Sequence, residues 1–219
     1  MKIKIFQVGY LGTNCYLVWD EASGEAMAVD PGAPEPAVTG AVSGNGLKLK
    51  YIALTHGHCD HIGGVEGLME SFPDAILAAG EKEAALLADP DMNMSYAVFG
   101  KRVALEAGLL LKEGDELCLG GLAFKAIETP GHTPGGLTFY AKGSDRELFE
   151  RPFSGTAFTG DTLFQASLGR TDLPGGDFSV LIASIREKLF SLPGDTVALP
   201  GHMDVTTIEN EKKYNPFVR

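Results

Sequence analysis

Alternation of apolar and polar positions marks the beginning of the chain and predicts short β-strands. The segments "KIKIFQV" (2–8), "NCYLVW" (14–19) and "AMAVD" (26–30) are each followed by a break at Gly, Asn or Asp, as is typical of strands that end in turns. After "PGAPEP", a weaker pattern favours a helix over 35–43, and "LKYIALT" (49–55) is the next predicted strand. The chain is therefore expected to begin with a sheet.

Helical spacing follows this region, and strand patterns then return. Residues 64–71, 80–88 and 97–107 favour helices, and the strand "AILAA" (75–79) separates the first two. The second half of the chain carries further predicted strands at 115–119, 122–129, 136–141, 155–161 and 196–200.

A helix is predicted to begin after Asp177, a residue type that often caps helix N-termini. Behind it, apolar residues recur with helical spacing at Phe178, Leu181, Ile182, Ile185 and Leu189. A last helix is expected over 205–213. Two strand-rich halves, each followed by helices, predict two packed sheets with helices outside, of the α/β or α+β class.

Composition limits the class of protein. With 44% apolar residues the chain can form a full core, and we expect a single domain over 1–219. No apolar run approaches the ~20 residues of a membrane helix, and the N-terminus lacks a signal-peptide pattern, so a cytoplasmic protein without membrane partners is expected. The net charge of −11 disfavours nucleic-acid partners. A small molecule is the expected partner, and these patterns leave the oligomeric state open.

Three cysteines occur without a C-x-x-C pair. Cys15 and Cys118 lie in strand-like apolar runs. This spacing argues against a disulfide framework or a zinc ribbon, and it predicts free, mostly buried thiols. Cys59 lies inside the histidine motif described next, at its variable position, and is expected to be a bystander; an auxiliary ligand or a redox-sensitive thiol are the alternatives.

All five histidines follow predicted strands. The motif "HGHCDH" holds His56, His58, Asp60 and His61, and two glycines close it. His132 in "TPGHTPGG" and His202 in "LPGHMD" each follow an apolar strand and a Pro-Gly pair, and Asp161 in "FTGDT" follows a strand and a single Gly. Loops at strand ends are where a rigid scaffold presents functional side chains, so we expect these residues to form one site.

The donor types predict a metal centre. Imidazoles and carboxylates without convergent thiolates suit zinc, iron or manganese. Seven donors are too many for one tetrahedral zinc, and they divide between two divalent ions with a carboxylate shared. His56 and His58 alternate along the backbone and can share one ion, whereas Asp60 and His61, further round the turn, point to a second. We expect two zinc ions first, with iron or manganese as alternatives.

The motif "HGHCDH" resembles the H-x-H-x-D-H motif of the metallo-β-lactamase superfamily. The segments "GHTPG", "TGDTLF" and "PGH" resemble its other metal motifs in the same order, and "GRTDLPGGD" (169–177), "KLFSLPGDT" and "NPF" are similar to the glyoxalase II (hydroxyacylglutathione hydrolase) branch. The resemblance implies an α+β fold, a four-layer αββα sandwich with a metal cleft at the edge of its two sheets.

The resemblance also assigns roles to single residues. It implies that the first ion is held by His56, His58 and His132, the second by Asp60, His61 and His202, and that Asp161 bridges both. Asp60 is also the candidate catalytic residue. Asp30, in "AVDPG", would hold the other ring nitrogen of a ligand histidine, unless it is only a turn carboxylate. Arg170 would contact glutathione, unless it forms a structural ion pair with Asp172 or Asp177.

These assignments favour thioester hydrolysis. Two ions ~3.5–4 Å apart can share a water, lower its pKa from ~15.7 toward ~7 and direct the hydroxide at a carbonyl. The motifs contain no dedicated general acid, and a thiolate, from a thiol of pKa ~8.5, needs little protonation to leave. Thioesters are therefore favoured over β-lactams, and the resemblance implies an acyl-glutathione such as D-lactoylglutathione.

Three departures from the branch leave alternatives open. The sequence resembles a short form without the C-terminal helical domain that binds glutathione, and Gly136 and Met203 replace residues common in relatives. A persulfide dioxygenase with a single iron and a lactone hydrolase are the alternative enzymes. A metal-binding regulatory protein is the alternative without turnover, although an open donor set favours an enzyme.

Overall fold

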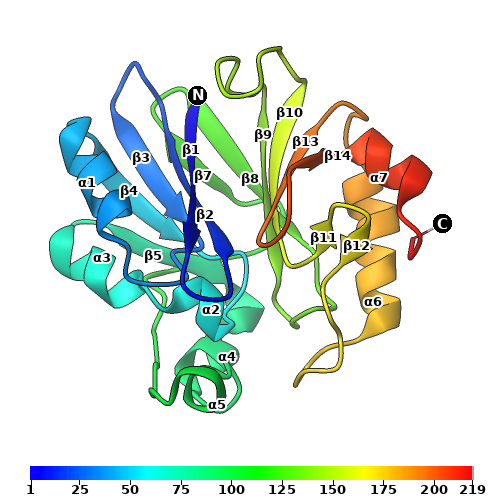
Figure 1. The fold of residues 1–219 in the computed structure, drawn as a ribbon, viewed down its shortest axis with the longest axis horizontal. Helices are drawn as coiled ribbons and strands as arrows, with labels where there is room; N and C mark the ends of the chain where they lie inside the picture. Colours follow the sequence, from blue (N-terminus) through cyan, green and yellow to red (C-terminus); the bar gives the residue numbers. More distant parts are fainter. Residues whose placement is uncertain (219) are drawn as a thin grey trace.

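Two mixed sheets of six strands face each other in the computed structural model, which describes residues 1–218 (Figure 1). The first sheet follows chain order, with β1 (Lys2–Val8), β2 (Thr13–Trp19), β3 (Glu25–Val29), β4 (Lys48–Ala53), β5 (Ile76–Gly80) and β6 (Leu109–Leu111). The second has the order β14-β13-β10-β9-β8-β7, with β7 (Glu116–Leu119), β8 (Leu122–Glu128), β9 (Leu137–Lys142), β10 (Gly155–Gly160), β13 (Val197–Pro200) and β14 (Thr206–Thr207).

Helices cover the outer face of each sheet. On the first sheet lie α1 (Pro36–Gly44) and α3 (Val65–Ser71), and on the second lie α6 (Phe178–Ala183) and α7 (Ile208–Tyr214) (Figure 1). A π-helical turn, η2 (Ser184–Lys188), and a 3-10 turn, η3 (Leu189–Ser191), extend α6. The predicted α+β sandwich with outer helices is confirmed.

Shorter elements lie at the edge where the sheets meet. They are α2 (Cys59–Ile62), the 3-10 turn η1 (Glu81–Glu83), α4 (Ala84–Ala88), α5 (Ser95–Phe99) and the hairpin of β11 (Leu163–Phe164) and β12 (Ser167–Leu168). The sequence pattern predicted a helix over 80–88 but neither α2 nor the hairpin.

Alternate residues of the central strands enter different cores. In β2, Cys15 and Leu17 pack under the helices of the first sheet, whereas Tyr16 and Val18 pack between the two sheets. Because successive side chains of a strand point to opposite faces, a strand buried on both faces must be apolar throughout. Apolar burial on both faces therefore fixes the register of β2, since a slip of one residue would exchange its faces.

The strand ends meet at one edge of the sandwich. β4 is parallel to β3, and β13 is parallel to β10, so the loops after these strands lie together. Backbone hydrogen bonds join the two sheets here. Leu137 N donates to Thr55 O at 2.7 Å, and Asn14 N donates to Gly201 O at 2.7 Å. This edge collects the loops that carry the histidines.

The helix predicted after Asp177 begins where expected, but only part of its predicted apolar face is buried. The Asp177 carboxylate caps α6 by accepting a hydrogen bond from Val180 N at 3.0 Å. Leu181, Ile185 and Leu189 are fully buried. Phe178 is 51% exposed, so it does not belong to the buried face that these three residues form.

One further helix prediction was wrong, whereas the prediction of free, mostly buried thiols holds for two of the three cysteines. The helix expected over 97–107 ends at Phe99, because Gly100 adopts the left-handed conformation (φ 66°) that terminates helices. The chain then runs irregularly to β6, a strand that the pattern did not predict. Cys118 is exposed, whereas Cys15 and Cys59 are buried; β7 is an edge strand whose Cys118 faces solvent while its neighbours face the core.

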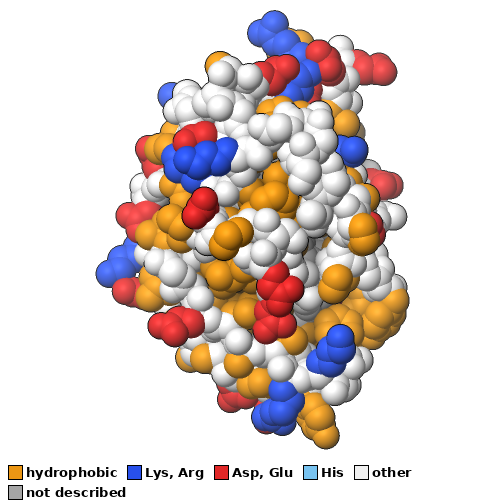
Figure 2. Space-filling view, turned by 90° about the vertical axis from the view of Figure 1, so that its left-hand side faces the viewer, with side chains coloured by type: hydrophobic (Ala, Val, Ile, Leu, Met, Phe, Trp, Pro, Cys, Tyr) orange, Lys and Arg blue, Asp and Glu red, His pale blue; other side chains and the backbone are white. Residues whose placement is uncertain are grey.

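Among residues 1–218, no helix has the length and apolarity needed to cross a bilayer. On the face that carries α1 and α3, acidic and basic side chains are scattered around apolar ones, and this view shows no extended basic patch (Figure 2).

Candidate metal centre

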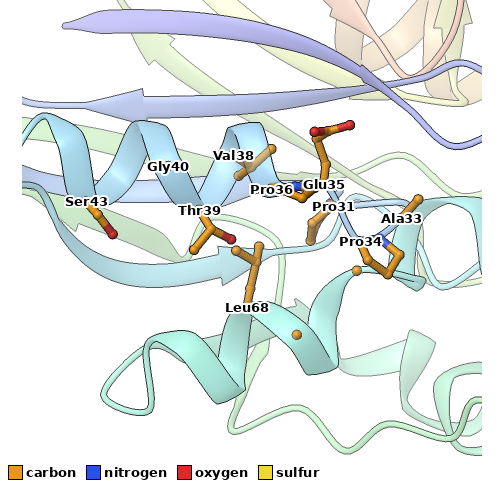
Figure 3. Close-up of a pocket in the computed structure, with 12 residues that line it drawn as sticks. Pro31, Ala33, Pro34, Glu35, Pro36, Val38, Thr39, Gly40, Ser43 and Leu68 are labelled. Atoms are coloured by element: carbon orange, nitrogen blue, oxygen red, sulfur yellow. The ribbon is translucent and has the colours of Figure 1, made fainter.

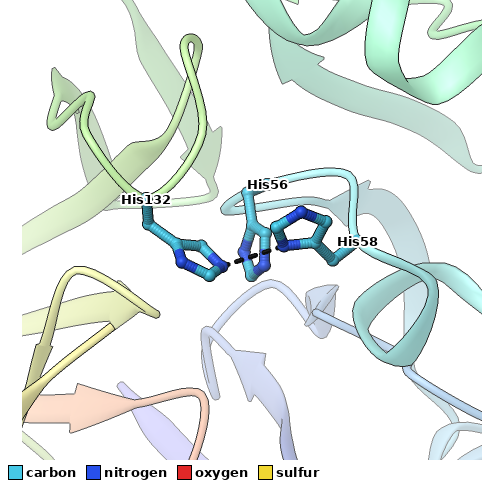
Figure 4. A group of neighbouring side chains, drawn as sticks. All are labelled: His56, His58 and His132. Carbon is cyan, nitrogen blue, oxygen red and sulfur yellow. Dashed lines mark hydrogen bonds between the residues drawn. The ribbon is translucent and has the colours of Figure 1, made fainter. Parts of the chain in front are cut away.

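Three buried histidines from two loops form the first donor group (Figure 4). His56 follows β4, His58 directly precedes α2, and His132 lies in the loop between β8 and β9. Each offers a ring nitrogen within 4.8 Å of the others. Nδ1 of His58 lies 2.9 Å from Nε2 of His132. This spacing suits three ligands of one ion.

A second group lies beside it and combines two imidazoles with a carboxylate. Asp60 and His61 lie in α2, and His202 follows β13. Their ligand atoms also lie within 4.8 Å of one another, and His202 Nε2 is 3.1 Å from Asp60 Oδ2.

Asp161 lies between the two groups. Its Oδ1 is 3.3 Å from His61 Nε2, and its Oδ2 is 3.7 Å from Nε2 of both His132 and His202. One carboxylate therefore faces donors of both groups. The structure thus brings together all seven residues for which the sequence predicts metal ligation.

The donors fit divalent cations. Buried polar atoms normally have hydrogen-bond partners, yet within the described chain Nε2 of His56, His58 and His61 and Oδ1 of Asp161 have none. These atoms are buried among nitrogen and carboxylate donors, and a cation would satisfy the lone pairs that they present. Imidazole and carboxylate donors match zinc, iron or manganese.

Burial keeps two of the histidines neutral. It lowers the pKa of His58 to about 3, assisted by the neighbouring His132 and His61. The pKa of His56 also falls well below its usual value through burial and the same neighbouring histidines. A neutral imidazole presents the lone pair that a metal requires.

His61 has the opposite electrostatic environment. Burial opposes its protonation, but the carboxylates of Asp161, Asp60 and Asp30 outweigh burial and raise its pKa well above the usual value. For Asp60, burial again opposes the charged form, and His61 and His202 nevertheless hold the pKa of this carboxyl well below its usual range. His61 would therefore have to lose a proton before its Nε2 could bind a cation.

Asp30 lies behind His61, on the side away from the cleft. It directly follows β3 with a left-handed φ of 50°, and its carboxylate accepts bonds from Thr55 N (2.7 Å) and Thr55 Oγ1 (2.6 Å). Its Oδ2 also lies 3.0 Å from His61 Nδ1. A carboxylate at the second ring nitrogen typically orients a ligand histidine and fixes its tautomer.

Arg170 touches the site through its backbone. His132 Nδ1 lies 2.6 Å from the Arg170 carbonyl oxygen. The exposed guanidinium binds Asp172 through Nε (2.7 Å) and a terminal nitrogen (2.8 Å), while Asp177 caps α6. Of the two ion pairs considered for Arg170, the structure contains the one with Asp172.

Three further residues contact the site, and the sequence patterns did not indicate a role for them. Thr13 donates to Asp60 Oδ2 at 3.2 Å, Thr55 links Asp30 to the loop of His56, and Glu83 binds the backbone of two ligand loops. The position of Thr55 next to the motif was an available signal. Thr13 and Glu83 carry no such signal, because only the fold brings them here.

Gly201 shows how closely the site is built. A Cβ atom at this position would lie 2.4 Å from Asp161 Oδ1 and 2.5 Å from His61 Cε1. Any side chain would therefore displace two of the candidate ligands, so the Pro-Gly pair before His202 is required by close approach.

A cleft of about 490 Å³ opens over the donors. Its walls are mostly apolar, and they include Leu11, Met94, Val98, Phe164, Leu168, Leu173 and Met203. Arg170 is the one Lys or Arg among its described lining residues. Met203 is 54% exposed and has a left-handed φ of 68°. Cys59 also lines the cleft, and burial raises the pKa of its thiol to about 11, so it is protonated at neutral pH.

A second hollow, of about 360 Å³, lies between α1 and α3 (Figure 3). Its one charged lining residue is Glu35, whose carboxylate already caps α1 by accepting from Ala37 N at 3.0 Å. Its lining offers no set of metal donors, and the chemistry is therefore assigned to the histidine cleft.

Comparisons with known proteins agree with this geometry. The family model described as the metallo-beta-lactamase superfamily matches residues 8–202. The hydroxyacylglutathione hydrolase GloC of Haemophilus influenzae is 36% identical over 219 residues, which cover 100% of this chain and 98% of that protein.

Two crystal structures are similar over nearly their whole length. The B3 metallo-beta-lactamase BLEG-1 has a TM-score of 0.87 and 35% identity, with 99% of each chain covered. TTHA1623, solved in a di-iron-bound form, has a TM-score of 0.78 and 33% identity over 98% of this chain and 99% of its own.

Proposed function

This chain belongs to the metallo-β-lactamase superfamily, and we propose that it is a metal-dependent hydrolase of thioesters, of the glyoxalase II type. The observation that carries the proposal is the placement of Asp161 between two donor groups, 3.3 Å from His61 Nε2 and 3.7 Å from His132 Nε2. The relationship to the hydroxyacylglutathione hydrolase GloC supports the same reaction class.

We propose that His56, His58 and His132 hold one divalent ion, that Asp60, His61 and His202 hold a second, and that Asp161 bridges them. Divalent ions lower the pKa of a bound water and polarise a carbonyl oxygen, and so they supply both nucleophile and electrophile for hydrolysis. Zinc is the ion we expect first. The di-iron form of TTHA1623 makes iron the alternative to test.

Asp60 is the proposed catalytic residue. Its carboxylate lines the cleft, is held by Thr13 and His202, and stays ionised because its pKa is lowered. It can therefore accept a hydrogen bond from water in the cleft and orient that water. Asp30 supports the site by holding Nδ1 of His61, which leaves Nε2 directed toward Asp161.

The residues available to assist a leaving group favour a thioester substrate. Among the described residues that line the cleft, no Lys or Tyr is present to protonate a departing amine. A thiol of pKa ~8.5 leaves as a thiolate with little assistance, whereas an amide nitrogen requires a proton. The apolar walls suit an acyl chain or an uncharged thiol arm. Arg170, the one lining cation, is the proposed contact for a charged arm such as glutathione.

The test is to load the purified protein with zinc or with iron and to assay substrates in parallel. They are D-lactoylglutathione, an acyl thioester of the uncharged thiol N-acetylcysteamine, and a cephalosporin. We expect hydrolysis of both thioesters, with kcat/KM at least about tenfold above that for the β-lactam, a difference of about 1.4 kcal/mol in the barrier. Hydrolysis of the cephalosporin alone would contradict the proposal.

The similarity to the B3 enzyme BLEG-1 makes β-lactam hydrolysis the second candidate function. Oxygen uptake with glutathione persulfide, measured on the iron-loaded protein, tests the persulfide dioxygenase alternative. Oxygen consumption without thioester cleavage would overturn the thioesterase proposal.

A further inference from the structure

Glu83 is a buried carboxylate that lies outside the proposed ligand set. It ends η1, the short turn between β5 and α4, and its side chain is fully buried. A buried carboxylate is costly unless it is well paired, so its partners indicate what it does.

Both oxygens of Glu83 bind backbone amides in the loops that carry the three histidines. Gly57 N, between His56 and His58, donates to Oε2 at 2.9 Å. Gly135 N, three residues after His132, donates to Oε1 at 2.7 Å. Figure 4 shows that the three rings come from two separate loops that face one another. Glu83 therefore holds both loops with one side chain.

Gly57 and Gly135 pack closely against the segment that carries Glu83. A Cβ atom at Gly135 would lie 2.4 Å from Glu83 N, and one at Gly57 would lie 2.6 Å from Leu86 Cδ2. The two loops thus rest directly on η1 and α4. If the carboxylate were removed, two buried N–H groups would lose their acceptor, and a buried donor without a partner is destabilising.

Glu83 also has no cation as a partner. No ion pair reaches it within residues 1–218, and the adjacent Lys82 pairs instead with Glu128 at 2.6 Å. Burial raises the pKa of Glu83, whereas the Thr133 hydroxyl and the two backbone amides oppose this shift and favour the charged carboxylate. A divalent ion held by the three histidines nearby would be stabilised by the charge of this carboxylate.

We infer that Glu83 is a positioning residue for the three-histidine subsite. It fixes the separation of the His56–His58 pair from His132, and its buried charge increases the affinity of this subsite for a divalent cation. The inference rests on the metal ligation in the proposed function and is independent of the substrate.

The main test is Glu83→Gln, which keeps the shape of the side chain, removes its charge and leaves one amide facing an NH₂ group. Affinity for Zn²⁺ is measured by chelator competition in a His202→Ala background, which weakens the second donor group. The expected result is a 10- to 100-fold loss of affinity, the range usual for residues that support metal ligands. The same substitution in a His132→Ala background should change Zn²⁺ binding to the remaining donors by less than about threefold.

Asp145→Asn is the matched control. Asp145 is also a buried carboxylate that accepts backbone hydrogen bonds, from the distant Ile3 N at 2.8 Å and from the nearby Leu148 N at 3.1 Å, and no hydrogen bond given for it within residues 1–218 comes from a ligand loop. Its substitution should lower the melting temperature and leave Zn²⁺ affinity unchanged. Equal loss of affinity in the Glu83 and Asp145 variants, or wild-type affinity in Glu83→Gln, would overturn the inference.

Glu83→Asp keeps the test decisive if the glutamine variant does not fold. The shorter carboxylate retains the charge but cannot reach both amides. The Zn²⁺ affinity of Glu83→Asp should therefore lie between those of wild type and Glu83→Gln. If only Glu83→Asp folds, its Zn²⁺ affinity should lie below that of wild type. Wild-type affinity in Glu83→Asp would exclude the positioning role. Absence of thioester hydrolysis would contradict the proposed function without changing any of these Zn²⁺ affinities, so the two failures are distinguishable.

Discussion

Nδ1 of His132 lies 2.6 Å from the backbone carbonyl oxygen of Arg170. A carbonyl can only accept, so Nδ1 donates this hydrogen bond, and Nε2 is the ring nitrogen that faces His58 and Asp161. The Arg170 side chain takes no part in this contact, because its guanidinium binds Asp172. The backbone of Arg170 thus orients a candidate ligand, while its side chain lies at the cleft in an ion pair with Asp172.

Arg170→Ala should therefore keep the metal and weaken only the binding of a charged substrate arm. We expect unchanged metal content and an increase in KM for D-lactoylglutathione of about two- to fivefold, since Asp172 competes for the guanidinium and exposed ion pairs contribute little. KM for the N-acetylcysteamine thioester should not change. Equal effects on both substrates would show that Arg170 serves only its ion pair with Asp172.

Asp30→Asn removes the charge beside His61 Nδ1. An amide that also has to serve two bonds from Thr55 cannot hold the ring as firmly, so we expect metal affinity and kcat to fall by about 10- to 100-fold. Asp177→Asn is the matched control, because Asn caps helices as well as Asp does and α6 carries no candidate ligand. Metal titration and steady-state kinetics on both variants check this, and a loss of similar size in Asp177→Asn would contradict it.

Metal binding to the second donor group should release protons at neutral pH. The pKa of His61 is raised, so the ring is protonated below this raised pKa and must lose its proton to ligate. Affinity at this group should therefore increase as pH rises through neutrality. His56 and His58, whose pKa values are lowered by burial, release none.

Calorimetry of Zn²⁺ binding measures this release, because the observed enthalpy depends on the ionisation enthalpy of the buffer when protons are transferred. The His202→Ala variant, in which the second group is incomplete, should show a smaller buffer dependence. A binding enthalpy of the wild type that is the same in all buffers would contradict the prediction.

The sequence predicted most strands and the full candidate ligand set because both depend on local patterns. "HGHCDH" places four donors within one turn, and the Pro-Gly pairs before His132 and His202 mark strand ends directly. Glu83 could not be found in this way, because "EKE" reads as an exposed charged helix until the fold buries one of its carboxylates. The helix expected over 97–107 failed for a related reason, since the left-handed Gly100 ends it and the following segment packs as irregular chain.

Met203 lines the cleft at a backbone position that favours glycine. Its φ of 68° is left-handed, and its side chain is 54% exposed, so the residue gains little from burial. Left-handed backbone costs about 1–2 kcal/mol for a residue with a Cβ atom. We therefore expect Met203 to form part of the substrate-binding wall of the cleft and to contribute little to the stability of the fold.

Met203→Gly should therefore leave the free energy of unfolding within about 1 kcal/mol of wild type, since relief of the left-handed strain offsets the added freedom of the unfolded chain. Met69→Gly is the control, because Met69 is 37% exposed in α3 and a mid-helix glycine costs about 1 kcal/mol. KM for a thioester with a long apolar acyl chain should rise several-fold in Met203→Gly, and KM for a short acyl thioester should stay constant. Denaturant unfolding and steady-state kinetics measure both effects. If KM does not depend on acyl length in the variant, Met203 does not form part of the acyl-binding wall.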